Sequence, residues 1–360
     1  MKSHKKVPWI ETPLIRSATL SNVAGCNVYL KMESLQPSGS FKSQGIGHFL
    51  TAKLASIRAG SNSDAAGPVH FYSSSGGNAG LGCVHGTVTL GCKATVVVPL
   101  TTTDCMVSKL RQAGAVAVVR HGESWQEADE HLVGTVMPEA QQSGETAVYV
   151  PPFDAPEIWE GNALIAHETV SQLWDASRHY PASDGGESLD VGRLDAIVCS
   201  VGGGGLFCGI VQGLDELKMD QTRVIGVETK GAESLAKAVA SRELITLPAI
   251  TSLATSLGPR TVCRKALEYG LRDTVSTAVF SDKEAVEACR RFANDERYLV
   301  EPACGVCFAL CYSGRLSELV PTLGRDSVVV FVVCGGSNVS IDILEGYMKG
   351  LSEGGEPHDG

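Results

Sequence analysis

The sequence predicts an α/β fold with two domains, each a mainly parallel, twisted sheet with helices on both faces. Three observations support this. The 360 residues suffice for about two domains at ~150 residues each. Runs rich in β-forming residues alternate with segments of helical length, which requires crossover connections between parallel strands. Several runs are apolar without interruption, as at 328–333, which is typical of a strand buried on both faces.

The predicted strands are short runs of β-branched and other apolar residues. In chain order they cover residues 28–32, 69–73, 94–99, 116–120, 147–150, 194–200, 224–228, 277–280 and 328–334. The helices expected between them lie at 43–58, 78–90, 124–141, 157–177, 206–218 and 283–294. We expect a smaller domain over residues 45–150, inserted into a larger domain formed by 1–44 and 151–360.

The composition excludes two classes of protein. Hydrophobic residues make up 43% of the chain and charged residues 19%, which is typical of a folded protein and not of a disordered one. The 30 Lys and Arg residues against 40 Asp and Glu residues give a net charge of -10. Nucleic acids and anionic membrane surfaces are bound by basic patches, so we expect no nucleic-acid and no membrane partner.

The N-terminal segment leads to an expectation about location. It begins with basic residues, but Pro8, Glu11 and Pro13 interrupt the apolar stretch that a signal peptide needs. No run of the sequence approaches the ~20 apolar residues of a membrane span. We therefore expect a cytoplasmic protein.

The cysteines favour a structural role over a metal site. Most of the 12 cysteines lie inside apolar runs, where a thiol behaves as a small hydrophobic group. Cys304, Cys307 and Cys311 have helical spacing, and a zinc site is the alternative interpretation. Because no paired Cys or His motif follows them, a buried helix face of small residues is the preferred explanation.

Four consecutive glycines at 202–205 form the strongest local feature. They follow a predicted buried strand and open a helix, so bare backbone N–H groups and the positive end of the helix dipole meet at one point. This combination predicts a phosphate site, whereas a plain tight turn needs only one glycine. The dinucleotide pattern Gly-x-Gly-x-x-Gly is absent, because Phe207 stands three residues after Gly204.

Two further turns follow predicted strands. Residues 73–80 read Ser-Ser-Ser-Gly-Gly-Asn-Ala-Gly, and hydroxyls and bare amides at a helix start suit a carboxylate, although an ordinary helix cap is an equal alternative. Residues 334–338 read Cys-Gly-Gly-Ser-Asn after the most apolar strand. Ligands of parallel sheets collect at the carboxyl ends of the strands, so the three turns predict one crevice.

A lysine completes the set of candidate groups. Residues 37–43 read Pro-Ser-Gly-Ser-Phe-Lys-Ser, which predicts a turn that leads into a helix at Lys42. A lysine is unexpected there, because helix N-termini favour anions. An exposed surface lysine is the simpler alternative. Beside a phosphate site, however, a lysine that reaches into a crevice is suited to form a Schiff base with a carbonyl group.

These motifs together resemble a known family. The segments 38–42, 75–80, 202–205 and 334–338, in this order, are similar to those of the pyridoxal-phosphate enzymes of fold type II, the tryptophan synthase β-like family. The segments 227–232, 250–258 and 301–305 resemble, more narrowly, the catabolic L-serine/L-threonine dehydratases (L-serine ammonia-lyases). The resemblance implies a lyase of amino-acid catabolism and gluconeogenesis that acts as a cytoplasmic homodimer on a small amino-acid substrate.

The resemblance also implies a cofactor site. Lys42 would hold pyridoxal 5′-phosphate covalently, and the N–H groups of residues 202–206 would bind its phosphate. Asn78 would hydrogen-bond the 3′-oxygen of the ring, and Phe41 and Ser256 would lie at its two faces. The implied cofactor-binding residues are Phe41, Lys42, Asn78, Gly202, Gly203, Gly204, Gly205, Leu206, Ser256 and Cys334.

Two more ligand sets follow from the same resemblance. The substrate carboxylate would be received by Ser75, Gly76, Gly77 and Ala79. A monovalent cation, of the potassium type, would be held by oxygens of Gly202, Glu228, Ala232, Ser234, Leu257 and Pro259. The side chain of Glu228 would supply the only full charge of that cation site.

Cys334 decides the expected chemistry. In the family this residue faces the pyridine nitrogen, and a thiol is a weak, neutral partner that would not hold the nitrogen protonated as an Asp would. We therefore expect β-elimination and not transamination, with Lys42 as the general base. L-serine would give pyruvate and ammonia, and L-threonine would give 2-oxobutyrate and ammonia.

One position departs from the family pattern. Gly76 stands where the dehydratases more often have alanine and the related serine racemases have serine. Glycine has no group that could protonate the opposite face of the substrate, so we expect poor racemisation. Glycine also adds backbone freedom in the turn.

Three alternatives have different site requirements. Cysteine or cystathionine synthase shares the fold but typically has a serine or threonine near the pyridine nitrogen. A non-catalytic protein that binds pyridoxal phosphate or an amino acid would keep the glycine turns without needing Lys42. A nicotinamide-dependent dehydrogenase would need the missing dinucleotide pattern.

Overall fold

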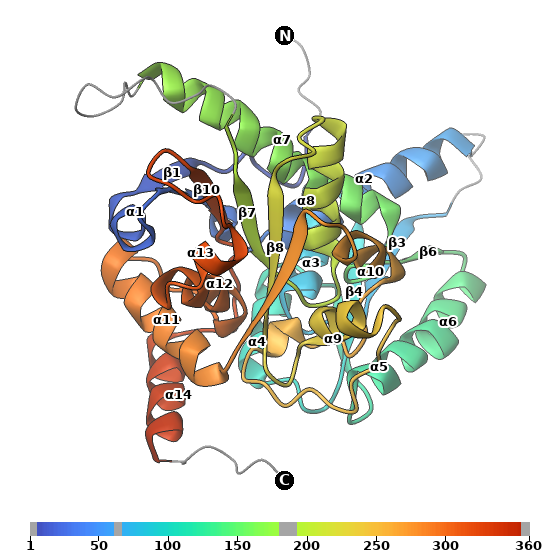
Figure 1. The fold of residues 1–360 in the computed structure, drawn as a ribbon. Coiled ribbons are helices and arrows are strands. Elements are labelled where there is room, and N and C mark those ends of the chain that lie inside the picture. Colours follow the sequence, from blue (N-terminus) through green and yellow to red (C-terminus); the bar gives the residue numbers. More distant parts are fainter. Residues whose placement is uncertain (1–5, 61–66, 180–192, 354–360) are drawn as a thin grey trace. The chain divides into compact units, whose positions relative to one another are not determined.

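The computed structural model describes residues 6–60, 67–179 and 193–353 of the chain (Figure 1). It divides into two compact units. The first unit consists of Met1–Glu11 and Leu35–Asn162, and the second of Thr12–Ser34 and Ala163–Gly360. The domain boundaries that the sequence suggested, with 45–150 as the smaller domain, stay a prediction.

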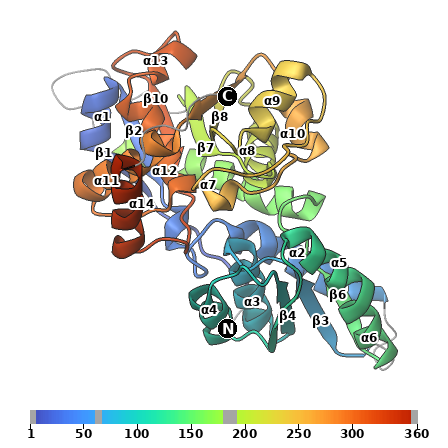
Figure 2. The same cartoon turned by 90° about the horizontal axis from the view of Figure 1, so that it is seen from below.

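The first unit is built on a parallel four-stranded sheet in the order β5-β4-β3-β6. Figure 2 labels three of these strands, β4, β3 and β6. Its strands are β3 (Val69–Ser73), β4 (Lys93–Val98), β5 (Ala117–Arg120) and β6 (Thr146–Tyr149). Its helices are α2 (Lys42–Gly60), α3 (Asn78–Leu90), α4 (Asp104–Gln112), α5 (Trp125–His131) and α6 (Met137–Gln142).

Helices cover both faces of this sheet, as predicted. Phe71 and Val96 belong to a core that also contains side chains of α2, α3 and α4. Tyr72 and Val97 belong to a second core, which includes Ala128 of α5. Successive side chains of a strand point to opposite faces, so the two cores lie on the two sides of the sheet.

The second unit has a six-stranded sheet in the order β1-β2-β10-β7-β8-β9. Only the pair β1–β2 is antiparallel. The strands are β1 (Leu14–Ser17), β2 (Asn27–Lys31), β7 (Ala196–Ser200), β8 (Arg223–Thr229), β9 (Val275–Phe280) and β10 (Val328–Val332). Every residue of β7 and β10 is buried, which explains their continuous apolar runs.

Helices again lie on both sides of the sheet, with α8 and α12 on opposite sides of β7 in Figure 2. The helix α7 (Pro156–His179) contains the boundary between the two units. The other helices of the second unit are α1 (Ala18–Ala24), α8 (Gly205–Glu216), α9 (Ser234–Ser241), α10 (Arg264–Gly270), α11 (Asp282–Glu296), α12 (Pro302–Tyr312), α13 (Leu316–Leu319) and α14 (Ile341–Glu353). The predicted α/β class with mainly parallel sheets is confirmed.

One strand was missed and one helix expectation was wrong. The antiparallel edge strand β1 was not predicted, because its middle residues are exposed and form no apolar run. The helix expected at 124–141 is divided into α5, a π-helical turn at Leu132–Val136, and α6. Pro138 stands in the first turn of α6, where its missing N–H is tolerated.

Cys304, Cys307 and Cys311 are fully buried on α12, as the preferred interpretation required. Within the described residues, no three His, Cys, Asp or Glu side chains lie together in a way that could hold a metal ion. Across the same residues, no helix has both the length and the apolar character needed to cross a membrane.

Candidate active site

Lys42 is the first residue of α2, as predicted. The preceding turn contains Gly39 with φ +79°, a left-handed conformation that suits glycine. The side chain of Lys42 is half-buried. Its Nζ donates a hydrogen bond to the carbonyl oxygen of Pro152 at 2.5 Å and lies 5.0 Å from the centre of the Phe41 ring. The alternative of an exposed surface lysine therefore does not describe this side chain.

Helix α3 packs closely against the backbone of Lys42. A Cβ atom on Gly82 would lie only 3.1 Å from the Cβ atom and the carbonyl oxygen of Lys42. Contacts shorter than 3.4 Å leave little space, so Gly82 permits the close approach of the two helices. The same helix α3 begins at Asn78, directly after the turn of residues 73–77, so Lys42 and this turn belong to one packed assembly within the first unit.

The serines of the turn at 73–77 do not cap α3. The N-cap residue Gly77 makes no side-chain cap hydrogen bond. The N–H of Gly77 donates to Ser75 Oγ at 3.3 Å. A Cβ atom on Gly80 would lie 1.9 Å from the carbonyl oxygen of Ser75, so this oxygen packs directly against Gly80. The alternative of an ordinary serine cap is therefore wrong, and the first-turn N–H groups of α3 have no acceptor within the helix itself.

Gly76 lies against the loop that follows β4. A Cβ atom on Gly76 would lie 2.9 Å from Thr102 Cγ2 and 3.0 Å from Thr102 Oγ1. The Thr102 side chain thus occupies the space beside the turn that a side chain at position 76 would need. Asn78 and Ala79, the other predicted residues of this region, are buried in the first turn of α3.

In the second unit, the four glycines connect β7 to α8, as predicted. Gly204 has φ +95°, and a Cβ atom there would lie 2.6 Å from Ala266 Cβ. A Cβ atom on Gly202 would lie 3.1 Å from Leu257 Cα and 3.2 Å from the carbonyl oxygen of Ser256. The turn is therefore a bare backbone cradle that admits no side chain at these two positions. Helix α8 begins within it and contributes the positive end of its dipole.

Cys334 follows the central strand β10 and is buried. Its Sγ lies 3.5 Å from Ser200 Oγ, at the end of β7. Gly335 and Gly336 continue the chain with φ +82° and +138°, which only glycine adopts readily. The turn at 334–338 then returns toward Ser256, because Asn338 Nδ2 donates to Ser256 Oγ at 3.4 Å.

These contacts connect the predicted residues of the second unit. Gly202 touches Ser256 and Leu257, and Ser256 is hydrogen-bonded to Asn338 in the turn after Cys334. Glu301 belongs to the family motif at 301–305, but the sequence did not predict its contact with the turn. It is 2% exposed and accepts the N–H of Asn338 at 3.1 Å.

The predicted cation ligands fall into two groups. The Glu228 carboxylate is fully buried and accepts the N–H groups of Leu235 and Ala236, at 2.8 and 2.7 Å, at the start of α9. Burial raises the pKa of Glu228 to about 8, although the two N–H donors act in the opposite direction. Ser234 Oγ, also at the start of α9, is buried and has no hydrogen-bond partner among the described residues.

The second group lies beside the glycine turn. Gly202 and Leu257 are in contact, and the half-buried Pro259 follows two residues later. Ala232 lies between Glu228 and Ser234 in sequence, and its N–H donates to the carbonyl of Thr229. The structure therefore places Glu228 beside Ser234, and Gly202 beside Leu257, while the joint role of all six residues stays a prediction.

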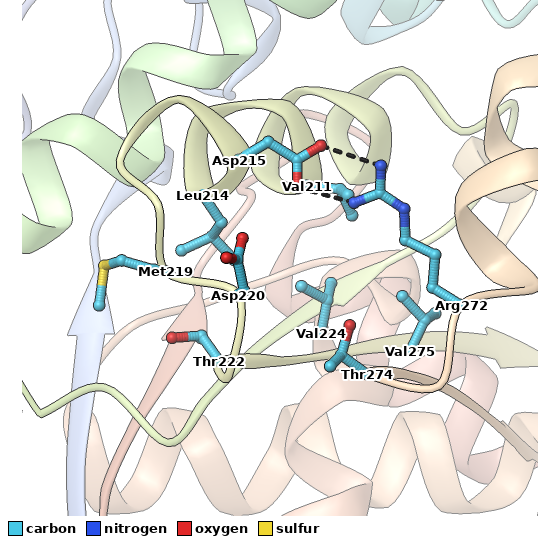
Figure 3. Close-up of a pocket in the computed structure, with 10 residues that line it drawn as sticks. All are labelled: Val211, Leu214, Asp215, Met219, Asp220, Thr222, Val224, Arg272, Thr274 and Val275. Atoms are coloured by element: carbon cyan, nitrogen blue, oxygen red, sulfur yellow. Dashed lines mark hydrogen bonds and ion pairs between the residues drawn. The ribbon is translucent and has the colours of Figure 1, made fainter.

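A separate cavity of about 210 Å³ contains none of the predicted site residues (Figure 3). It lies near the first residues of β8 and β9, at the strand ends opposite to the glycine turn. Arg272 spans its rim and forms two hydrogen bonds with Asp215, at 2.7 and 2.9 Å. The lining residues are Val211, Leu214, Asp215, Met219, Asp220, Thr222, Val224, Arg272, Thr274 and Val275.

A family model described as "Pyridoxal-phosphate dependent enzyme" matches residues 7–335. The chain belongs to this family. The match begins before the first strand and ends directly after Cys334, so it includes both glycine-rich turns and Lys42. The predicted resemblance to the pyridoxal-phosphate enzymes is thereby confirmed.

Curated relatives within this family have similar lengths and related names. A human protein named L-serine dehydratase/L-threonine deaminase is 40% identical over 351 residues, covering 95% of each chain. A Saccharomyces cerevisiae L-serine dehydratase is 37% identical over 337 residues, covering 93% of this chain and 95% of the relative. The crystal structure of a fungal L-serine ammonia-lyase from Rhizomucor miehei superposes with a TM-score of 0.82, at 32% identity over 95% of this chain and 99% of that chain.

The described residues fit the cofactor that defines the family. The turn at Gly202 and Gly204 carries no side chains, since neighbouring atoms fill the space that a Cβ atom would need, and its bare N–H groups suit a phosphate. The amine of Lys42 is held at a defined position by the carbonyl of Pro152. The family thus accounts for two features, the bare cradle and the oriented amine, that a packing role alone leaves unexplained.

Proposed function

We propose that the protein eliminates the β-hydroxyl of L-serine and L-threonine as water. Hydrolysis of the released enamine product would then give ammonia with pyruvate or 2-oxobutyrate. The observation that carries this proposal is the oriented helix-start amine of Lys42 in the first unit. The second unit adds a side-chain-free turn at Gly202 and Gly204. The names of the relatives that are 37% and 40% identical over nearly the whole chain support the same substrates.

The proposed cofactor contacts are those expected from the sequence. Lys42 would hold the cofactor covalently, the N–H groups of residues 202–206 its phosphate, and Asn78 the 3′-oxygen. Phe41 and Ser256 would face the ring, and Cys334 its nitrogen. When bound, pyridoxal phosphate withdraws electrons from the α-carbon of an attached amino acid and makes loss of the α-proton easy.

The chain's own groups would carry out the remaining tasks. The substrate carboxylate would be oriented by the N–H and hydroxyl groups of Ser75, Gly76, Gly77 and Ala79, at the start of α3. The amine of Lys42 would accept the α-proton, as a general base. Because Cys334 and its neighbour Ser200 are neutral groups, they would not keep the ring nitrogen protonated, which favours prompt loss of the β-hydroxyl over transamination.

A monovalent cation of the potassium type is part of the proposal. The support is the fully buried Glu228 carboxyl group, whose pKa is raised by burial, and the Ser234 oxygen, which has no hydrogen-bond partner among the described residues. A cation would supply a positive charge for Glu228 and a bond to the Ser234 oxygen. We also propose a cytoplasmic homodimer that serves amino-acid catabolism and gluconeogenesis, as the family resemblance implies.

The proposal is tested by measuring keto-acid release from L-serine and L-threonine by the purified holoenzyme. We expect pyruvate and 2-oxobutyrate in a 1:1 ratio with ammonia, and no release by Lys42→Ala. Absence of keto acid together with formation of cysteine or cystathionine from a thiol co-substrate would instead identify a synthase. Pyridoxal phosphate binding without any turnover would identify the non-catalytic alternative.

A further inference from the structure

Asp129, on α5, connects the turn after β3 to the rest of the first unit. Its Oδ1 atom accepts a hydrogen bond from Ser74 Oγ at 2.6 Å and a second one from Tyr149 Oη at 2.7 Å. Ser74 directly follows β3 and precedes Ser75, the first residue proposed to contact the substrate carboxylate. Tyr149 is the last residue of β6.

Burial and charge make these two contacts strong. Ser74 is 1% exposed, and Asp129 is half-buried. An ionised carboxylate can only accept hydrogen bonds, so both hydroxyl groups donate to it. Burial and the bond to Asp129 both raise the pKa of Tyr149, so its hydroxyl keeps its proton and stays a donor. Hydrogen bonds of this charge-assisted kind are roughly twice as strong as neutral ones.

The contacts inside the turn are weaker than its contact with Asp129. The N–H of Ser75 lies 3.4 Å from Ser73 Oγ, and the N–H of Gly77 lies 3.3 Å from Ser75 Oγ. Gly76 adds backbone freedom between them. The short bond from Ser74 to Asp129 therefore fixes the beginning of a turn whose own contacts are long.

We propose that Asp129 is a positioning residue, which acts through Ser74 to hold the N–H groups of residues 75–77 in place for the substrate's α-carboxylate. The inference rests on the proposed function and adds a residue to it that has no contact with substrate. Ser74 Oγ donates its proton to Asp129, so the carboxylate of Asp129 is already hydrogen-bonded at the residue next to the proposed carboxylate site. Loss of Asp129 should weaken substrate binding and leave the chemical step intact.

Steady-state kinetics of Asp129→Ala test this role. The matched control is Glu130→Ala. Glu130 is the next acidic residue of α5, is exposed, and accepts a hydrogen bond from Gln126 of the same helix at 2.9 Å. We expect the KM for L-serine to rise about tenfold in Asp129→Ala, which corresponds to loss of one charged hydrogen bond. We expect kcat to stay within about threefold and the cofactor absorbance to stay unchanged. Asp129→Asn keeps an acceptor oxygen and should recover part of the loss.

A second variant separates positioning from a general effect on folding. Ser74→Ala removes the same bond from the other side, so its KM should rise as in Asp129→Ala. Because both substitutions break the same hydrogen bond, the KM of the double variant should be no higher than that of either single variant. Tyr149→Phe keeps the bond from Ser74 to Asp129 but removes a hydroxyl that also contacts Ser74, so its KM should rise less than in Ser74→Ala.

Hydrogen exchange of the holoenzyme provides a readout besides activity. The amides of residues 75–77 should exchange about tenfold faster in Asp129→Ala and Ser74→Ala, and at the wild-type rate in Glu130→Ala. Equal KM and equal exchange in Asp129→Ala and Glu130→Ala would overturn the inference, as would additive effects of Asp129→Ala and Ser74→Ala. If the wild-type protein released no keto acid, the proposed function would fail, and the exchange rates would still decide whether Asp129 holds the turn.

Discussion

The two glycine-containing turns of the candidate site are stabilised in different ways. The turn at 202–205 is fixed by close backbone packing, with Gly204 at φ +95° and Gly202 against the backbone of Leu257. The turn at 73–77 is fixed by hydrogen bonds of side chains, above all the one from Ser74 to Asp129. The first turn thus depends on the absence of side chains, and the second on side chains supplied by a distant helix.

This difference has a functional consequence. A bare cradle suits a group that is bound permanently, because its N–H donors need no further adjustment. A turn held by one external hydrogen bond can be tuned by single substitutions in α5 or β6 without altering the backbone that contacts the ligand. We therefore expect substitutions in the turn at 202–205 to affect cofactor binding and substitutions in the turn at 73–77 to affect substrate binding.

The largest effect should come from Gly204→Ala. The new Cβ atom would lie 2.6 Å from Ala266 Cβ at a left-handed φ, so the turn must distort. We expect cofactor affinity to fall about 100-fold and the free energy of unfolding to fall by about 2–3 kcal/mol. Cofactor titration and thermal unfolding measure the two effects.

Gly346→Ala is the matched control for that variant. Gly346 lies in α14, and a Cβ atom there would meet nothing within 4 Å. Because alanine is the better helix former, this variant should be as stable as the wild type or slightly more so. Equal behaviour of the two variants would contradict the packing explanation of the turn at 202–205.

A smaller effect is expected from Gly76→Ala in the other turn. Its Cβ atom would collide with side-chain atoms of Thr102, and a second substitution at Thr102 can remove these atoms. We expect kcat/KM for L-serine to fall about tenfold, with cofactor affinity unchanged. The double variant Gly76→Ala/Thr102→Ala should recover most of the activity.

Recovery of activity in the double variant would show that Gly76→Ala acts through the collision with Thr102 and not through the loss of backbone flexibility. If Gly76→Ala and the double variant were equally impaired, the backbone freedom of glycine, and not the space taken by Thr102, would explain the need for Gly76.

The last prediction concerns Glu228 of the second unit, which is held differently from Asp129 of the first. Asp129 accepts two hydroxyls, whereas Glu228 accepts two backbone N–H groups and has its pKa raised from 4.5 to about 8. Between pH 4.5 and about 8, Glu228 is therefore protonated in the folded protein and ionised in the unfolded chain. Stability contributed by this group should fall as pH rises from about 5 to about 8, and level off above.

Thermal unfolding of wild type and Glu228→Gln without potassium tests this slope. The wild type should lose several degrees of Tm relative to Glu228→Gln across that pH range, and potassium should restore them above pH ~8, where the carboxylate is ionised. Parallel pH profiles of the two proteins would show that Glu228 does not titrate in this range.

The sequence predicted the elements that local patterns define. The start of α2 at Lys42, the start of α3 at Asn78 and the glycine turn before α8 all follow from Gly, Ser and apolar spacing within a few residues. The edge strand β1 was missed because its exposed middle has no apolar run.

The supporting contacts of the site could not be predicted in the same way. Ser74 and Asp129 are 55 residues apart, and no sequence motif around either residue predicts its contact with the other. The collision between position 76 and Thr102 likewise depends on how the loop after β4 returns to the turn. Such contacts depend on how α5 packs on the sheet and on the path of the loop after β4, and local sequence patterns do not predict either.

The central claim is that the amine of Lys42 holds the cofactor. Reduction of the holoenzyme with borohydride, followed by mass mapping of its peptides, tests it most directly. The account predicts a stable pyridoxyl group on Lys42, and a colourless protein after Lys42→Ala. A pyridoxyl group on any other lysine, or a Lys42→Ala protein that keeps its absorbance, would contradict it.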